Sequence, residues 1–273
     1  MKKRKALNAA MAVLCGVCAL ISVLALFLIL GYIVFKGIWA VNWDFITKLP
    51  KPVGETGGGI ANAIAGSAKI VALAACMGAP VGVLGGIYLA EYGRGKTGAF
   101  IRYCSDILNG MPSIIIGIFV YTLLVLPMRR FSALSGSCAL AVIMIPVVLR
   151  NTEEFLRLVP SPVREGGLAL GLPRWKVTLR VVLPSAMRGI MTGVILSVSR
   201  IAGETAPLIF TAFGNRFWDN GFLQPMAALP LAIFTYAISP YEDWHRQAWA
   251  SALILIALVL AGNIAARLIM RKI

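Results

Sequence analysis

Six long apolar stretches run along the chain, and each is close to the length that a helix needs to cross a lipid bilayer. A spanning helix takes about 20 mostly apolar residues, because each residue advances it by only about 1.5 Å. Segments richer in charged residues, glycine or proline separate the stretches. The pattern predicts an all-α polytopic membrane protein with six transmembrane helices, approximately over residues 10–34, 60–88, 107–127, 132–149, 186–210 and 248–269.

A further apolar segment, Met226 to Ile238, is too short to cross the bilayer and is interrupted by Pro230. Counting it as a span would also place Arg267 and the basic residues after it on the outside. We therefore expect an interfacial or re-entrant helix here.

Small residues recur every four positions in two of the predicted spans. Gly78, Gly82 and Gly86 lie in the second span, and Gly189 and Gly193 lie in the fifth. Such stripes let helix backbones approach closely in a membrane, so they predict packing faces.

The composition excludes a soluble globular protein. Hydrophobic residues make up 59% of the 273, against about 45–50% on average, and charged residues 14% against about 25%. The mean hydropathy is +0.84, and only 11 acidic residues are present. A soluble fold of this size could not bury so much apolar surface.

The distribution of basic residues predicts the orientation in the membrane. Most of the 26 Lys and Arg lie in or beside segments 1–9, 89–106, 150–185 and 270–273, which alternate with the other loops. Basic loops stay in the cytoplasm beside anionic lipid. We expect a multi-pass protein of the cell inner membrane with both termini in the cytoplasm and an extracytoplasmic loop over about 211–247.

The net charge of +15 could also suggest a nucleic-acid-binding protein. The charges flank apolar spans, however, and form no basic stripe interleaved with exposed aromatic residues. The sequence favours membrane lipid over nucleic acid as a partner.

No catalytic or metal site is predicted. Gly95-Lys96-Thr97 resembles the end of a phosphate-binding loop, but Ala90 stands where that motif needs a glycine, and a membrane helix precedes it. The single histidine, His245, has no ligand or triad companions nearby in sequence. We expect neither catalytic activity nor a bound cofactor or metal in this chain.

The predicted cytoplasmic loop 150–185 has the signals of two short helices. Ser161 can cap a helix with Pro162 at its first position, Glu165 falls in the first turn, and Gly171 suits the C-terminal stop. A helix of about nine residues, about 13 Å long, is expected here. A second helix is expected from Pro173 to Leu183, lying along the lipid headgroups.

This loop resembles the EAA loop of ABC-importer permeases. The matching positions are Glu165, Gly171, Leu183 and Pro184, with Val181 in place of isoleucine. Gly166 and Gly167 replace two alanines, each at a cost to the helix of up to about 1 kcal/mol. The resemblance implies a coupling helix seated in a cleft of a cytoplasmic ATPase subunit. The alternative is a generic amphipathic connector.

Charged residues fall inside the fifth predicted span. Ser197, Arg200 and Glu204 are spaced i, i+3 and i+7, which predicts one shared helix face. Charges in a span are costly unless they are paired or face a polar cavity. Two interpretations stay open: a structural ion pair, or a permeation site in which Arg200 binds an anion and Glu204 competes with it.

Arg150, at the cytoplasmic end of the fourth predicted span, has two equally weighted interpretations. It is either a second station for the anion or an ordinary boundary arginine that pairs with Glu153 or Glu154.

Several further stretches resemble one branch of these permeases, the PstA-type permeases of phosphate-specific ABC importers. The resemblance runs from about residue 55 to the end of the fifth predicted span. Lys69 departs from it, since an apolar residue is expected there. The matching stretches are Thr56-Gly57-Gly58-Gly59-Ile60, Gly110-Met111-Pro112-Ser113-Ile114 with Gly117, Pro146 through Arg150 to Glu154, and Arg200-Ile-Ala-Gly203-Glu204-Thr205-Ala206-Pro207-Leu208.

The resemblance implies the type I, MetI-like permease fold, with a cytoplasmic N-terminus over 1–9 and one six-helix transmembrane domain over 10–270. It implies an importer of inorganic phosphate with three kinds of partner component. These are a homologous PstC-like permease, two copies of a PstB-like ATP-binding subunit that uses ATP and magnesium, and an extracytoplasmic PstS-like phosphate-binding protein.

Other functions remain open from the sequence. A permease for sulfate or molybdate would carry the same loop and could use a similar arginine. An ion-coupled secondary transporter is disfavoured by the short chain and by the lack of a second homologous half. A membrane scaffold that senses phosphate status through partners would not need the intramembrane arginine.

Overall fold

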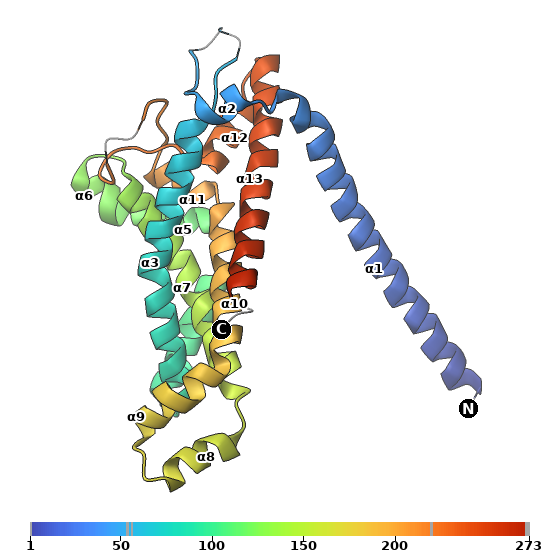
Figure 1. The fold of residues 1–273 in the computed structure, drawn as a ribbon, viewed down its shortest axis with the longest axis vertical. Helices are drawn as coiled ribbons and strands as arrows, with labels where there is room; N and C mark the ends of the chain where they lie inside the picture. Colours follow the sequence, from blue (N-terminus) through green and yellow to red (C-terminus); the bar gives the residue numbers. More distant parts are fainter. Residues whose placement is uncertain (1, 53–54, 56, 219–220, 271–273) are drawn as a thin grey trace.

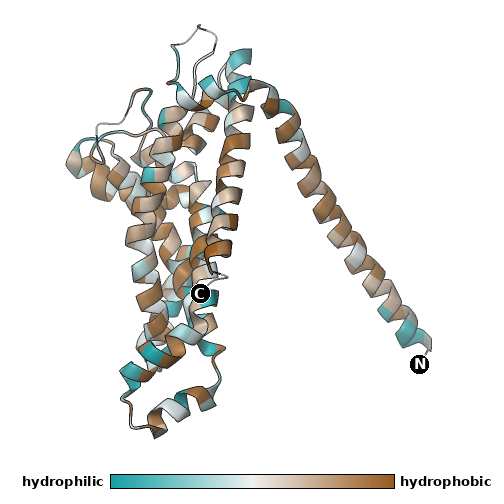
Figure 2. Ribbon diagram, in the orientation of Figure 1, coloured by the Kyte–Doolittle hydropathy of each residue, from teal (hydrophilic) through white to brown (hydrophobic). Residues whose placement is uncertain are grey.

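The computed structural model describes residues 2–52, 55, 57–218 and 221–270, and every regular element in those ranges is a helix. The long helices run roughly side by side, apart from the first, which leans away from the bundle (Figure 1). Their surfaces are mostly apolar, and hydrophilic residues gather toward the helix ends (Figure 2). This is the expected distribution for a protein that spans a membrane.

Five helical segments are long and apolar enough to cross a bilayer, among the described residues. A sixth crossing is possible if the bent pair Lys96–Gly110 and Ser113–Met128 counts as one span. The prediction of six transmembrane segments is met on this count. The five are α1 (Lys2–Gly37), α3 (Ala61–Glu91), α7 (Ala133–Arg157), the continuous rod Arg174–Ala202, and α13 (Glu242–Met270).

Shorter elements complete the chain. The bent pair consists of α4 and of α5, a π turn and α6, and the rod consists of α9, a second π turn and α10. Their bounds are η1 (Ile38–Ala40), α2 (Trp43–Thr47), α4 (Lys96–Gly110), α5 (Ser113–Val120), η2 (Tyr121–Val125), α6 (Leu126–Met128), α8 (Ser161–Ala169), α9 (Arg174–Val177), η3 (Thr178–Val182), α10 (Leu183–Ala202), α11 (Ala206–Thr211) and α12 (Leu229–Ala237).

The third predicted span, 107–127, is wrong at its start. Residues 107–110 belong to α4, and the chain then bends by 104° before α5. The cause is Pro112, because a residue that precedes proline is pushed out of the helical region. Met111 accordingly adopts φ −75° and ψ 136°.

The fifth predicted span, 186–210, is wrong at both ends. The helix begins at Arg174, so the separate headgroup helix predicted from Pro173 to Leu183 is instead the first part of the rod. The π turn η3 precedes Pro184, a residue that cannot donate a helical hydrogen bond. At the other end the helix stops at Ala202, and α11 begins only at Ala206.

The short helix α12 agrees with the prediction for 226–238. It has nine residues, far fewer than a bilayer crossing needs. Its N-terminal backbone is anchored to α3, where the hydroxyl of Ser67 accepts a hydrogen bond from the amide of Leu229 at 2.7 Å.

The central packing unit is the pair α3 and α7. A Cβ at Gly82 would lie 2.7 Å from Cβ of Val148, and one at Gly86 would lie 2.5 Å from Cβ of Thr152. No side chain fits in such gaps, so the glycines are what let the two helices approach. The predicted packing face on the second span is confirmed.

The glycines of α10 play the same part against the other side of α7. A Cβ at Gly189 would lie 2.2 Å from the ring of Phe155, and one at Gly193 would lie 2.7 Å from Cβ of Asn151. Helix α7 therefore lies between α3 and α10, and it carries many of the buried side chains.

Helix α1 leans away from this bundle and meets it near its C-terminal end (Figure 1). Tyr32 contacts Trp249 of α13 edge to face, with ring centroids 5.2 Å apart. Most of its described side chains are exposed apolar groups, which suit a lipid environment.

The packing predicts that Gly86→Ala destabilises the bundle. The added methyl would overlap Thr152 and Leu149, and such overpacking costs about 1–3 kcal/mol. We expect a clearly lower midpoint of thermal unfolding in detergent. The control is Gly16→Ala on α1, where a Cβ would meet no described atom within 4 Å and alanine favours the helix. Equal midpoints for the two variants would contradict the packing argument.

Candidate functional site

Helix α8 lies at the end of the bundle where α3 and α7 finish, below the long helices in Figure 1. It spans Ser161–Ala169, so the predicted nine-residue helix in the loop is confirmed. Glu165 is exposed, and so are the apolar side chains of Leu168 and Leu170. An exposed helix that presents both apolar and acidic groups is suited to binding a partner.

The ends of α8 differ slightly from the prediction. Ser161 is the first helical residue, and Pro160, with an extended ψ of 145°, occupies the cap position. The predicted cap by Ser161 is therefore wrong by one residue. Gly171 has φ of 78°, the left-handed conformation that a glycine stop provides, so this part of the prediction is confirmed.

The two glycines of α8 have different surroundings. A Cβ at Gly167 would lie 3.0 Å from both methyl carbons of Val177, so α8 rests closely on the start of the rod. A Cβ at Gly166 would meet no described atom within 4 Å. Close packing therefore explains only Gly167. Leu183, half-buried, and Pro184, exposed, lie farther along the rod, at the start of α10.

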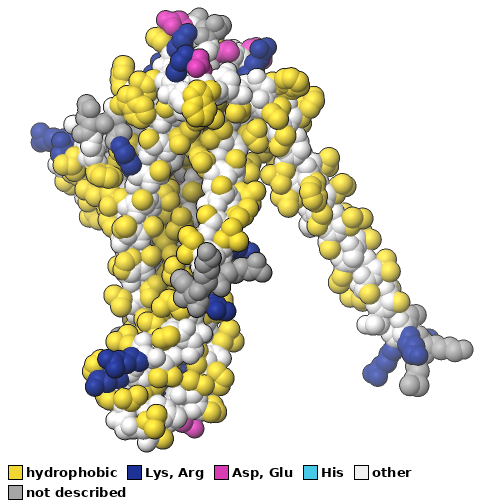
Figure 3. Space-filling view, viewed as in Figure 1, with side chains coloured by type: hydrophobic (Ala, Val, Ile, Leu, Met, Phe, Trp, Pro, Cys, Tyr) yellow, Lys and Arg dark blue, Asp and Glu magenta, His cyan; other side chains and the backbone are white. Residues whose placement is uncertain are grey.

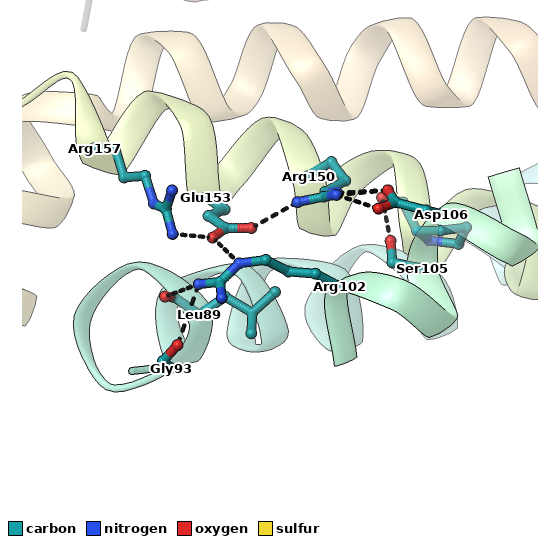
Figure 4. A network of polar contacts seen from close by, with 9 residues as sticks. Leu89, Gly93, Arg102, Ser105, Asp106, Arg150, Glu153 and Arg157 are labelled. Atoms are coloured by element: carbon teal, nitrogen blue, oxygen red, sulfur yellow. Dashed lines mark hydrogen bonds and ion pairs between the residues drawn. The ribbon is translucent and has the colours of Figure 1, made fainter. Parts of the chain in front are cut away.

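Arg150 lies in a charged network between α4 and α7 (Figure 4). Its Nη2 is 2.6 Å from each carboxylate oxygen of Asp106, and its Nε is 3.0 Å from Oδ1. A longer contact of 3.4 Å joins Nη1 to Glu153. The expected pairing with Glu153 is thus present, but the stronger partner, Asp106, was not anticipated.

Glu153 is the centre of this network and is 2% exposed. Its carboxylate accepts a hydrogen bond from Arg102 Nε at 2.7 Å and lies 2.6 Å from Arg157 Nη2. Arg102 also donates to the carbonyls of Leu89 and Gly93, at the end of α3. The network therefore joins three helices at the same end of the bundle.

The sequence contains a signal for the members of this network, although it does not show which of them pair. On α4 a basic residue precedes an acidic one by a turn, Arg102 before Asp106. On α7 a basic residue also precedes an acidic one, Arg150 before Glu153. Because the two helices pair the residues crosswise, each cation meets a carboxylate.

Arg200 and Glu204 form a loose pair at the opposite end of α10. Arg200 Nε and Glu204 Oε1 are 4.0 Å apart, too far for a hydrogen bond. The Arg200 side chain is 51% exposed, and that of Glu204 is 19% exposed. The arginine is therefore available to another group.

The predicted grouping of Ser197, Arg200 and Glu204 is confirmed only for Arg200 and Glu204, which lie 4.0 Å apart. Ser197 is 1% exposed, and its hydroxyl donates to the carbonyl of Gly193 at 2.8 Å. Glu204 lies beyond the end of α10 at Ala202, so the helical spacing that placed it on the stripe no longer applies. Glu204 lies in the short connection between the turn at Gly203 and the start of α11.

Helix α11 is held in place by close contact with α5. A Cβ at Gly117 would lie 2.7 Å from the Cα of Pro207. Gly117 and Pro207 both belong to stretches that carry the family resemblance. Of the glycine-rich stretch 56–60, Thr56 lies outside the described residues, and Gly57 accepts a hydrogen bond from Gln247 at 3.1 Å.

Comparisons with known proteins show the family to which the chain belongs. Residues 82–273 match the family described as the binding-protein-dependent transport system inner membrane component. A phosphate transport system permease protein PstA from Xylella fastidiosa is 44% identical over 273 residues, with 99% of this chain and 95% of the relative covered. The chain belongs to this permease family, in its PstA branch.

Two further PstA relatives show how widely the similarity to this permease extends. The protein from Yersinia pestis is 45% identical over 240 residues, covering 88% of this chain and 81% of the relative. A probable PstA from Methanocaldococcus jannaschii is 38% identical over 247 residues, covering 90% and 87%.

Solved structures of other transporters share the fold of this permease. A chain of the inward-facing MetNI methionine ABC transporter has a TM-score of 0.64 at 16% identity, covering 78% of this chain and 96% of that chain. A chain of an amino acid ABC transporter with histidines has a TM-score of 0.58 at 17% identity, covering 78% and 93%. The MetI-like permease fold expected from the sequence is confirmed.

The network predicts that Glu153→Gln weakens this permease. The change leaves the cations of Arg102, Arg150 and Arg157 around a neutral group. Breaking a buried ion pair costs about 3–5 kcal/mol, and we expect the lower end because the arginines are partly exposed.

The measurement is the midpoint of thermal unfolding in detergent, with Glu154→Gln as the matched control. Glu154 is exposed and adjacent in sequence, so its variant should unfold like the unmodified protein. A Glu153 variant as stable as the control would show that the network contributes little to stability.

Proposed function

We propose that this chain is the transmembrane permease subunit of an ATP-driven ABC importer that moves inorganic phosphate into the cytoplasm. The observation that carries the proposal is the similarity to PstA proteins along almost the whole chain, 44% identity with 99% of the chain covered. The exposed helix α8, which carries the EAA-like motif, supports the part that concerns ATP-driven coupling.

The proposed orientation places both termini and α8 in the cytoplasm of a cell with this chain in its inner membrane. Most of the Lys and Arg residues lie in the segments assigned to the α8 end of the bundle and to the start of α1, while fewer belong to the opposite end, where basic side chains are also visible (Figure 3). Basic segments favour the cytoplasmic side, so the distribution supports this orientation.

In this proposal α8 is the coupling helix and sits in a cleft of a separate ATP-binding subunit. Glu165 contacts that subunit, while Gly166 and Gly171 shape the helix, and Gly167 lets it lie against the rod. Leu183 and Pro184 then join the coupling region to the membrane. ATP and magnesium are held by the PstB-like partner, of which two copies are needed, and this chain binds no cofactor.

The proposed anion pathway passes Arg200. A guanidinium is a permanent cation with a donor fork suited to an oxyanion. The carboxylate of Glu204, 4.0 Å away, is close enough to reduce the local positive charge. It is too far away to form a hydrogen bond with the Arg200 guanidinium. The hydroxyl of Ser197 is already engaged with Gly193, so we assign Ser197 a packing role beside the pathway and no contact with the anion.

Arg150 is the proposed second station, near the cytoplasmic side. An anion there would have to compete with Asp106, whose side chain is 55% exposed. The competition would keep binding weak enough for release, as conduction requires.

Two further partners are proposed, a second permease subunit and a phosphate-binding protein. The half-exposed Arg200 needs a second wall around it, which a homologous PstC-like permease would provide in a two-fold arrangement. A PstS-like phosphate-binding protein would dock on the outer loop 211–247, which contains α12.

The direct test is uptake of labelled phosphate at low external concentration in cells that lack this gene, with the gene restored or withheld. The measurement is repeated after ATP is depleted while the proton gradient is maintained. We expect uptake that returns with the gene and is lost with ATP. Restored uptake that survives ATP depletion would instead indicate a secondary transporter. Absence of phosphate uptake would lead to tests with sulfate and molybdate.

The coupling role predicts that Glu165→Lys abolishes transport while the permease still folds. The reversed charge at an exposed position should disturb the contact with the ATP-binding subunit and leave the bundle intact. Phosphate uptake is measured together with the amount of protein in the membrane. Glu154→Lys, an exposed reversal outside α8, is the control. Normal uptake by the Glu165 variant would contradict the coupling role.

The pathway predicts that Arg200→Gln reduces the phosphate flux about tenfold or more, because a hydrogen bond to a charged group contributes about 1.5–3 kcal/mol. Assembly of the complex should be retained, as measured by purification with the partner subunits. Arg188→Gln, an exposed arginine near the other end of α10, is the matched control. An unchanged flux would assign the Arg200–Glu204 pair to structure.

A further inference from the structure

Arg164, the residue before Glu165, connects α8 to the ends of two other helices. Its Nε and Nη2 lie 3.2 Å and 2.9 Å from Oε1 of Glu91 at the end of α3. Its Nη1 donates to the carbonyl of Val159 at 2.7 Å, and its Nη2 donates to that of Leu156 at 2.6 Å. A single guanidinium thus joins α8 to α3 and to the end of α7.

The four contacts use the geometry of arginine fully. The guanidinium has five donors in a rigid plane, so it can bind a carboxylate and two carbonyls at once. Arg164 is 24% exposed and Glu91 is 14% exposed, which reduces the competition from water. The lysine ammonium is a smaller charge without this fork and could not reproduce the set.

Glu91 is at an unfavourable place for the stability of α3 alone. It is the last residue of that helix, where the helix dipole disfavours a negative charge. Pairing with Arg164 removes this disadvantage. The carboxylate is therefore better explained by its contact with α8 than by any contribution to its own helix.

The cavity beside Arg164 and Glu91 also indicates that their contact connects α8 to α3. A cavity of about 430 Å³ lies between α8 and the end of α3, lined in part by Arg94, Leu168 and Arg174 together with the pair itself. Side chains do not fill this region as they fill the α3–α7 contact. The connection from α8 to α3 therefore depends on the guanidinium more than on apolar packing.

The helices at the far side of this connection are packed closely against each other. Gly82 and Gly86 bring α3 into close contact with α7, so a force applied to the end of either helix acts on both. The other connection of α8 is the contact between Gly167 and Val177, which leads to the rod and α10. The coupling helix is thus linked separately to two parts of the bundle.

We propose that Arg164 is a positioning residue that, through Glu91 and the end of α7, transmits the movement of α8 to the α3–α7 pair. The proposal rests on the proposed function, since it needs α8 to move with an ATP-binding subunit. In this proposal, Arg164 and Glu91 determine how efficiently ATP hydrolysis is converted into transport of the anion.

The test uses two conservative variants, Arg164→Lys and Glu91→Gln, in the complete complex reconstituted in vesicles with its partner subunits and phosphate-binding protein. Phosphate transported per ATP hydrolysed is measured and normalised to assembled complex. We expect this ratio to fall about fivefold or more in each variant. Fivefold is about the smallest effect that is typical of energetic coupling between two sites. Hydrolysis itself should continue.

Matched controls make the same chemical changes where no such link exists. Arg180→Lys and Glu154→Gln alter exposed residues of the rod and of α7, and they should leave the ratio unchanged. The exchanged double variant, Arg164→Glu with Glu91→Arg, restores the ion pair with reversed charges but loses the carbonyl contacts. It should recover part of the ratio lost in Arg164→Glu alone.

An unchanged ratio in both conservative variants would overturn the proposal. A fall in the amount of complex or in its thermal stability at an unchanged ratio would also overturn it, because the pair would then be structural. So would failure of both variants to assemble. Failure of the proposed function would give a different result, because the unmodified protein itself would then transport no phosphate or bind no ATP-binding subunit.

Discussion

The close approach of α3 and α7 is the constraint on which the rest of the bundle depends. Inside a bilayer, helices gain no hydrophobic energy by associating with each other, so contact area between them must come from close packing. Gly82 and Gly86 provide it on one side of α7, and Gly189 and Gly193 provide it on the other. Helix α7 becomes the central element, and α4, α8 and α11 are positioned relative to it.

Charged side chains are placed where this packing ends. The Glu153 network joins α3, α4 and α7, and Arg164 joins α8 to α3 and α7 at the same end of the bundle. Arg102 and Arg164 donate to backbone carbonyls at the C-terminal ends of α3 and α7, where carbonyls lack helical partners. This end of the molecule is therefore held by polar contacts together with a small apolar cluster, whereas the middle is held mainly by apolar contacts.

The anion site that we propose is only half enclosed. Arg200 is exposed on a single chain and is separated from its carboxylate by 4.0 Å, so the chain presents a cation without completing a cavity. This feature is consistent with a subunit that functions in a larger assembly.

The local sequence was sufficient for the membrane class, the glycine packing faces and the short helix α8, and its six spans agree with the structure when the bent pair is counted as one span. These features depend on local spacing and on composition, which the sequence contains in full.

Tertiary structure decided which charged side chains pair with each other. Arg150 pairs mainly with Asp106, which is 44 residues away, and Arg164 pairs with Glu91, 73 residues away. It also decided that Ser197 turns inward and that α10 ends before Glu204. Such pairings depend on which helix ends meet in space, and no local pattern specifies that.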